Sequence, residues 1–213
     1  MYIPRYLESK IRQIHETFKV LYVGGARQVG KSTLLNHIAS SFGIKKVNMD
    51  DPALRKMAQT DPDFFLQQFP APLFIDEVEY AAELLSSIKL RVDARDTRGQ
   101  YWLSGSQHFS LIKGLQESLA GRVGIVTLYG LSQGEEYGYP LTRNPFLPGK
   151  SMADVPPKPL SDVMARIFRG SFPALAADPQ LRREDFYSSY IQTYLDRDVS
   201  GVFGVEKIRD FHT

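Results

Sequence analysis

A run of small and charged residues after a short apolar segment is the part of the sequence best suited to chemistry. Residues 22–33 read YVGGARQVGKST, in which Gly25 is followed after four residues by Gly30, Lys31 and Ser32. Glycines let successive backbone N–H groups curl toward an anion, and a helix that begins at Lys31 adds unpaired N–H groups at its amino end. The spacing is that of a P-loop, which binds nucleotide phosphates.

The residues of this loop have distinct expected roles. Lys31 brings a mobile positive charge to the β- and γ-phosphates during catalysis, and Ser32 offers its hydroxyl to Mg²⁺. ATP is the expected nucleotide, because no N-K-x-D guanine-reading motif occurs in the chain. The predicted nucleotide-binding residues are Gly25, Ala26, Arg27, Gln28, Val29, Gly30, Lys31, Ser32 and Thr33.

A second, acidic segment is expected to complete the site, because a P-loop alone binds phosphate without cleaving it. The segment LFIDEV, residues 73–78, is an apolar run that ends in Asp76 and Glu77. Ligands of open α/β sheets gather at the carboxyl ends of the strands. We predict that Asp76 helps Ser32 to hold Mg²⁺, and that Glu77 activates a water molecule for attack on the γ-phosphate.

Two further groups have an expected role and an ordinary alternative. Ser104, Ser106 and Gln107 form the polar tip of the segment QYWLSGSQ. They would lie beside the γ-phosphate and sense it if their strand is inserted between the strand before the loop and the acidic strand; the alternative is that they cap the following helix. Arg122 could reach transition-state charge on a nucleotide held by a neighbouring subunit, or could form an ordinary surface salt bridge.

The surrounding pattern predicts the elements that position these residues. Short apolar runs bounded by turn residues alternate with helical patterns, which is typical of right-handed βαβ units and a parallel sheet covered on both faces. Asp51 and Asp61 each precede a proline and are expected to cap short helices. The five predicted strands are 19–23, 44–49, 72–78, 100–106 and 123–128.

The chain is expected to divide after this α/β part. We predict an ATPase domain over residues 1–140, a proline-rich linker or loop over 141–159, and a helical segment over 160–213. In the last segment, Phe186, Tyr187 and Tyr190 recur at helical spacing. Such an aromatic stripe usually packs in a core.

Composition narrows the class of protein. The chain has no cysteine, which excludes disulfides and thiolate chemistry. Its formal net charge of +2 is well short of the excess that marks a dedicated nucleic-acid binder. The N-terminus lacks an apolar leader, and no run approaches the roughly 18 apolar residues of a membrane helix. We expect a soluble, cytoplasmic protein with no membrane partner.

The quoted motifs resemble a family of prokaryotic AAA-type ATP-binding proteins. The resemblance is carried by IPRYLESKI, GGARQVGKSTLL, NMDDPALRKMAQTDPDFFL, LFIDEVEYAAELLSSIK, YWLSGSQHFSLIKGLQESLAGRV and LYGLSQGEEY. It implies a three-layer P-loop NTPase fold with strand order 5-1-4-3-2, the Walker roles given above for Lys31, Ser32, Asp76 and Glu77, and a sensor at Ser106 or Gln107.

The resemblance also bears on Arg122 and on the end of the chain. It implies that Arg122 matches an arginine typical of the family. Members of this family continue through further helices and a nuclease-like domain, whereas this sequence ends at residue 213. We therefore expect an incomplete C-terminal helical segment and assign no nuclease activity.

Two functions are compatible with these features. The leading hypothesis is an ATPase that hydrolyses ATP with Mg²⁺ and drives a conformational change; a homo-oligomer that shares arginines between subunits is a candidate form of this ATPase. The alternative is a nucleotide-gated binding module with negligible turnover that presents a surface to DNA or to a protein partner.

Overall fold

The computed structural model describes residues 2–106, 114–115, 117–139 and 157–194 of the 213-residue chain. The chain divides into two compact units, Met1–Asp154 and Val155–Thr213, which are described separately. Most of the predicted linker, 141–159, lies outside the described residues. None of the described helices is both long enough and apolar enough to cross a membrane.

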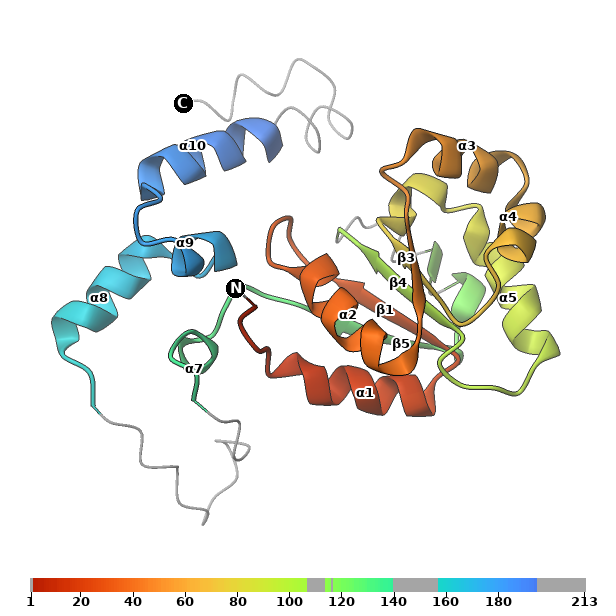
Figure 1. Ribbon diagram of the computed structural model, residues 1–213, viewed down its shortest axis with the longest axis horizontal. Coiled ribbons are helices and arrows are strands. Elements are labelled where there is room, and N and C mark those ends of the chain that lie inside the picture. Colours follow the sequence, from red (N-terminus) through yellow and green to blue (C-terminus); the bar gives the residue numbers. More distant parts are fainter. Residues whose placement is uncertain (1, 107–113, 116, 140–156, 195–213) are drawn as a thin grey trace, which may run out of the picture. The chain divides into compact units, whose positions relative to one another are not determined.

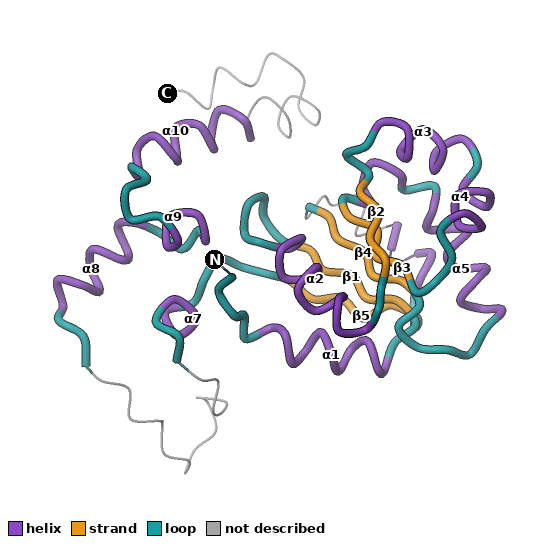
Figure 2. The backbone as a smooth tube through the Cα atoms, in the orientation of Figure 1, coloured by secondary structure: helices purple, strands orange, loops and turns teal. Residues whose placement is uncertain are grey.

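The first unit is built on a parallel five-stranded sheet (Figure 2). The strands are β1 (Val20–Gly24), β2 (Lys45–Asn48), β3 (Leu73–Asp76), β4 (Tyr101–Gly105) and β5 (Val123–Thr127). Their spatial order is β2-β3-β4-β1-β5, so the predicted order 5-1-4-3-2 is confirmed. Strand β4 is inserted between β1 and β3, with Leu103 beside Tyr22 on one side and Ile75 on the other.

Burial along the strands follows their place in the sheet. Every residue of the inner strands β1, β3 and β4 is buried, which explains their nearly continuous apolar sequence. The outer strands carry exposed positions, namely Lys45 and Lys46 on β2 and Ile125 on β5. The carboxyl ends of the inner strands therefore form a rigid edge on which a site can be positioned.

Helices cover both faces of the sheet, as predicted (Figure 1). One face is covered by α1 (Leu7–Thr17) and α2 (Lys31–Ala39), which is followed by the 3₁₀ turn η1 (Ser40–Phe42). The other is covered by α3 (Pro52–Thr60), α4 (Pro62–Gln68), the 3₁₀ turn η2 (Val78–Ala81) and α5 (Leu84–Ala94). The first unit thus forms three layers, and this part of the fold prediction is confirmed.

The two short helices after β2 begin as the sequence predicts. The side chain of Asp51 accepts hydrogen bonds from the backbone N–H groups of Ala53 and Leu54, at 2.8 and 3.3 Å. That of Asp61 accepts one from Phe64 N–H at 2.9 Å. Both aspartates are N-caps ahead of a proline at the first helical position, so they belong to the framework and not to the site.

The chain leaves β5 through the short helix α7 (Gln133–Glu136), which begins with a reciprocal capping box. Ser132 Oγ accepts from Glu135 N–H at 3.2 Å, and the Glu135 carboxylate accepts from Ser132 N–H at 2.8 Å. Glu135 is only 7% exposed, although it lies on a surface helix. The Glu135 carboxylate is buried because it pairs with Arg5, which lies near the N-terminus.

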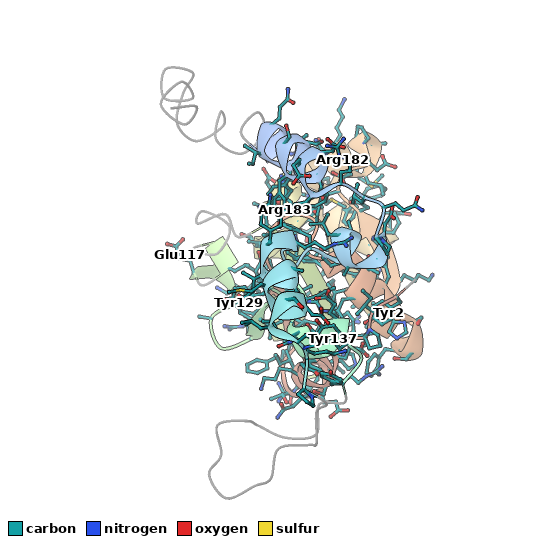
Figure 3. The ribbon with its side chains drawn as sticks, turned by 90° about the vertical axis from the view of Figure 1, so that its left-hand side faces the viewer. Tyr2, Glu117, Tyr129, Tyr137, Arg182 and Arg183 are labelled. Carbon is teal, nitrogen blue, oxygen red and sulfur yellow. The ribbon has the colours of Figure 1, made fainter. Side chains whose placement is uncertain are left out.

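The second unit contains α8 (Leu160–Arg169), α9 (Pro173–Ala177) and α10 (Arg183–Tyr194). The predicted aromatic stripe lies on α10, where Phe186, Tyr187 and Tyr190 contact the ring of Phe172 at centroid distances of 5.1, 5.8 and 4.9 Å. Arg183, labelled in Figure 3, places its guanidinium 5.1 Å from the Tyr187 ring. The stripe packs within its own unit, but Phe186, Tyr187 and Tyr190 are only partly buried, so its role as a core stays a prediction.

Candidate nucleotide-binding site

The predicted phosphate loop connects the end of β1 to the start of α2. A Cβ atom on Gly25 would lie 2.3 Å from the carbonyl oxygen of Leu128, so only glycine fits between the loop and the segment after β5. Gly30 has φ 94° and serves as the N-cap of α2, a left-handed conformation that favours glycine. Gln28 also has a positive φ, of 61°. Ala26 and Gln28 are exposed, whereas Val29 is buried.

Lys31 is the first residue of α2 and is folded back over the loop. Its ammonium donates hydrogen bonds to the carbonyl oxygens of Gly25 and Ala26, both at 3.0 Å, and the residue is 5% exposed. Burial lowers the pKa of Lys31, and this effect is opposed by the negative charges of Glu77 and Glu79. A cation is therefore held inside the loop, where anionic phosphates would be bound. The neighbouring Thr33 is exposed on α2.

The loop and the acidic strand meet at one pair of atoms. Ser32 Oγ donates a hydrogen bond to Asp76 Oδ1 at 3.0 Å, and Ser104 Oγ of β4 donates a short one to the same oxygen. Because the hydroxyl hydrogen of Ser32 points at Asp76, the lone pairs of Ser32 Oγ remain available for a cation. Hydroxyl and carboxylate oxygens are ligands that suit Mg²⁺, which keeps most of its waters and substrate phosphates as further ligands. The residues present therefore fit the predicted ion.

No larger metal cluster exists in the part of the chain that the structure describes, because no three His, Asp or Glu side chains converge there.

Glu77 follows Asp76 in a strained position. It has φ 56° and ψ 49°, a left-handed conformation that is rare outside glycine, and its backbone N–H points at Ser104 Oγ at 3.4 Å. Its Oε2 atom is buried and has no hydrogen-bond partner among the described residues. Burial raises the pKa of Glu77 to about 7, helped by the nearby Glu79 and opposed by Lys31. A carboxylate with a pKa near neutrality is suited to accept a proton.

Strand β4 brings its polar tip next to this acidic segment, because it pairs with both β1 and β3. Ser106 donates to Glu79 twice, from its N–H at 2.9 Å and from its Oγ at 2.5 Å. The carbonyl oxygen of Ser106 accepts from the buried hydroxyl of Tyr22 at 3.0 Å. Its sensor role stays a prediction, and Gln107 lies outside the described residues.

Arg122 lies at the amino ends of the strands, whereas the phosphate loop lies at their carboxyl ends. It directly precedes β5, whose amino end is level with the amino end of β1. Its guanidinium pairs with Asp93 of α5 through a short Nε contact and an Nη2–Oδ2 hydrogen bond of 3.0 Å. This pair lowers the pKa of the Asp93 carboxyl. Within its own chain Arg122 therefore forms the salt bridge that was the alternative reading, and a role toward a neighbouring subunit stays a prediction.

Lys46 is a second cation beside Asp76 that the sequence motifs did not indicate. Lys46 of β2 places its Nζ atom 2.7 Å from Asp76 Oδ2. The partner of Lys46 depends on the pairing of β2 with β3, which no local sequence pattern reports.

The sequence motifs also did not indicate the role of Arg5, a buried arginine near the N-terminus. Arg5 donates from Nη1 to Val29 O in the phosphate loop at 2.9 Å, and from Nη2 to Tyr129 O and Gly130 O at 2.7 and 3.1 Å. Its Nε pairs with Glu135 Oε1 at 3.1 Å. Arg5 thus ties the loop to the segment that leads from β5 into α7; Tyr129 of that segment is labelled in Figure 3.

Comparison with known proteins defines the class to which this fold and site belong. A family model described as an AAA domain matches residues 17–137, so the chain belongs to that AAA domain family. The family indicates a P-loop domain that binds nucleotides.

Two relatives are mycobacterial proteins described as uncharacterized, Rv2008c of Mycobacterium tuberculosis and Mb2031c of Mycobacterium bovis. Each is 27% identical over 124 residues, which is 58% of this chain and 28% of the relative. This chain thus spans little more than a quarter of either. A solved structure, the Walker-type ATPase PABY2304 of Pyrococcus abyssi, is similar with a TM-score of 0.46 and 18% identity, covering 65% of this chain and 57% of that one.

Proposed function

We propose that the protein binds ATP with Mg²⁺ and hydrolyses it, and that the cycle drives a conformational change. The observation that carries this proposal is the 3.0 Å hydrogen bond between Ser32 Oγ and Asp76 Oδ1. It joins the end of the phosphate loop to the end of the acidic strand, two segments 44 residues apart. A loop that served only as a turn would not need to meet a buried carboxylate.

The residues of the site have separate tasks in this proposal. Backbone N–H groups of the loop and of the first turn of α2 hold the phosphates, and Lys31 adds its positive charge. Ser32 and Asp76 would hold Mg²⁺, which when bound neutralises charge on the phosphates. Glu77 accepts a proton from the attacking water, for which its raised pKa of about 7 is suitable.

The conformational part of the proposal follows from Arg5. Arg5 binds Val29 in the loop and Glu135 in α7, so a movement of the loop changes the support of α7. Helix α7 directly precedes the residues that lead to the second unit. We propose that nucleotide state is relayed along this path to the C-terminal helices or to a partner.

The experiment is phosphate release from ATP and Mg²⁺ by the purified chain, with Glu77→Gln and Lys31→Ala as test variants. Glu83→Gln, which changes an exposed carboxylate close to the site in sequence, is the matched control. We expect release by wild type and Glu83→Gln, ATP binding without release by Glu77→Gln, and loss of ATP binding by Lys31→Ala. Release by wild type no faster than by Glu77→Gln would rule out hydrolysis.

Other outcomes distinguish the remaining possibilities. Tight nucleotide binding without turnover in wild type would indicate the nucleotide-gated binding module, and a steep loss of DNA affinity with salt would then point to DNA as its partner. If a neighbouring copy supplies Arg122, turnover per chain rises with protein concentration, and Arg122→Ala lowers turnover without lowering ATP affinity.

A further inference from the structure

The buried carboxylate of Asp76 has a positively charged neighbour, Lys46, to which the proposed reaction assigns no role. Asp76 is 2% exposed. Its Oδ1 atom accepts from the hydroxyls of Ser32 and Ser104, and its Oδ2 atom pairs with Lys46 Nζ at 2.7 Å. The hydroxyls belong to the nucleotide site described above. Lys46 has no role in it.

The pairing of β2 with β3 explains how Lys46 reaches this carboxylate. Asn48 lies beside Asp76 in the register of the two parallel strands, and Lys46 lies beside Phe74. From there the aliphatic part of Lys46 extends toward the carboxyl end of β3, with its ammonium 5.5 Å from the centre of the Phe74 ring. The Lys46 side chain is 31% exposed and that of Asp76 is 3% exposed, so the ion pair is shielded mainly on the Asp76 side.

We propose that Lys46 is a positioning residue that neutralises Asp76 and thereby sets the Mg²⁺ concentration at which the nucleotide site fills. This inference rests on the proposed function, because it concerns the same magnesium site. The ammonium and a divalent cation would share one carboxylate, so each weakens the hold of that carboxylate on the other. Even with the screening of bulk water, such a repulsion changes cation affinity about tenfold.

The same arrangement has a benefit for the protein without metal. A carboxylate as buried as Asp76 is costly to leave without a counter-ion, and two hydroxyl donors do not supply the missing charge. Lys46 therefore stabilises the folded site, at the cost of a higher Mg²⁺ requirement. A lysine whose ammonium pointed into solvent, away from Asp76, would have neither effect.

The first experiment measures magnesium dependence without measuring turnover. The thermal stabilisation produced by excess ATP is followed as MgCl₂ is added, in wild type, Lys46→Met and Lys46→Arg. Lys45→Met is the matched control, because Lys45 is the exposed neighbour on the opposite side of β2. We expect Lys46→Met to lower the half-saturating Mg²⁺ concentration about tenfold, and Lys46→Arg and Lys45→Met to leave it within about twofold of wild type.

The second experiment is a double-mutant cycle in EDTA and without nucleotide, with Lys46→Met, Asp76→Asn and the double variant. We expect Lys46→Met alone to lower the Tm by about 3–6 °C, and to have little effect once Asp76 is already neutral. Equal effects of Lys46→Met in both backgrounds would show that the two residues are not coupled, and would overturn the proposal. Lys46→Gln, which removes the charge but keeps a hydrogen-bond donor, replaces Lys46→Met if that variant does not fold.

The outcomes separate this inference from the proposed function. If wild type gains no stability from ATP with Mg²⁺, the nucleotide site itself is wrong and the inference fails with it. If wild type gains stability, but Lys46→Met leaves the half-saturating Mg²⁺ concentration unchanged or raises it, the inference alone is wrong.

Discussion

Replacing Glu77 with glutamine should stabilise the folded protein in alkaline solution while abolishing its proposed catalysis. The structure buries the Glu77 carboxylate beside Glu79, which raises its pKa from 4.5 to about 7. The folded chain therefore binds this proton more tightly than the unfolded chain. The contribution to stability is fully present below about pH 4.5 and is lost as the pH rises through about 7.

The magnitude follows from that gap in pKa. At about 1.4 kcal/mol per pKa unit, the difference between 4.5 and about 7 corresponds to an upper limit of about 3 kcal/mol. Glu77 is only partly buried, so solvent screening reduces the expected effect to about 1–2 kcal/mol. Glutamine has nearly the same shape and stays neutral, so Glu77→Gln should be more stable than wild type by that amount at about pH 8.5, and by much less at about pH 5.

The assay is urea unfolding at both pH values in EDTA and without nucleotide. Trp102 is the only tryptophan of the chain and lies fully buried in β4, so its fluorescence reports on the unit that contains the site. The control is again Glu83→Gln, which should show no such pH-dependent gain. A Glu77→Gln variant that is no more stable than wild type at about pH 8.5, or whose gain is the same at both pH values, would refute the reasoning.

Three further predictions concern the framework of the first unit. Arg5→Met should lower the free energy of unfolding by about 2–4 kcal/mol, because it leaves Glu135 buried without its cation; an unchanged urea midpoint would contradict this. Burial lowers the pKa of His15, whose Nδ1 accepts the indole N–H of Trp102 at 3.1 Å. The folded chain therefore loses stability as the pH falls below about 6.5, whereas His15→Gln, which accepts but does not titrate near that pH, should lose less; equal acid sensitivity in urea unfolding would refute this. Asp51→Ala should cost about 1 kcal/mol through the lost N-cap of α3, measured by thermal unfolding, and no change in Tm would count against it.

The framework was predictable because its signals are local. Each strand is a short apolar run between turn residues, and each of the two capped helices begins at an aspartate followed by proline. Helix α1 was not predicted, although its buried residues Ile11 and Ile14 are spaced for a helical face. The order of the strands came from the resemblance, because periodicity locates a strand without saying which strand lies beside it.

The site was predictable only in part, for a related reason. Ser32 and Asp76 come together because the phosphate loop follows β1 and Asp76 ends β3, and the carboxyl ends of these parallel strands lie at the same end of the sheet. The partners of Lys46 and Glu79 depend instead on strand register, which no local pattern reports. The partner of Arg5 is harder still to predict, because 130 residues separate Arg5 from Glu135. The spacing of Ser132 and Glu135 is typical of a capping box, but nothing in the sequence indicates that Glu135 also pairs with Arg5.

The residues proposed for chemistry are also those that strain or destabilise the fold. Gln28 and Glu77 both have the left-handed backbone conformation, and Lys31 is a buried cation whose pKa burial lowers. These features persist because the loop follows the fully buried strand β1 and Glu77 follows the fully buried strand β3, and both strands hold the adjoining backbone in place. Nucleotide binding would restore part of the lost stability, because phosphates supply the negative charge that Lys31 otherwise lacks in the loop. A substitution such as Glu77→Gln would relieve part of the same cost without a ligand, so a gain in stability and a loss of turnover are two consequences of one buried carboxylate.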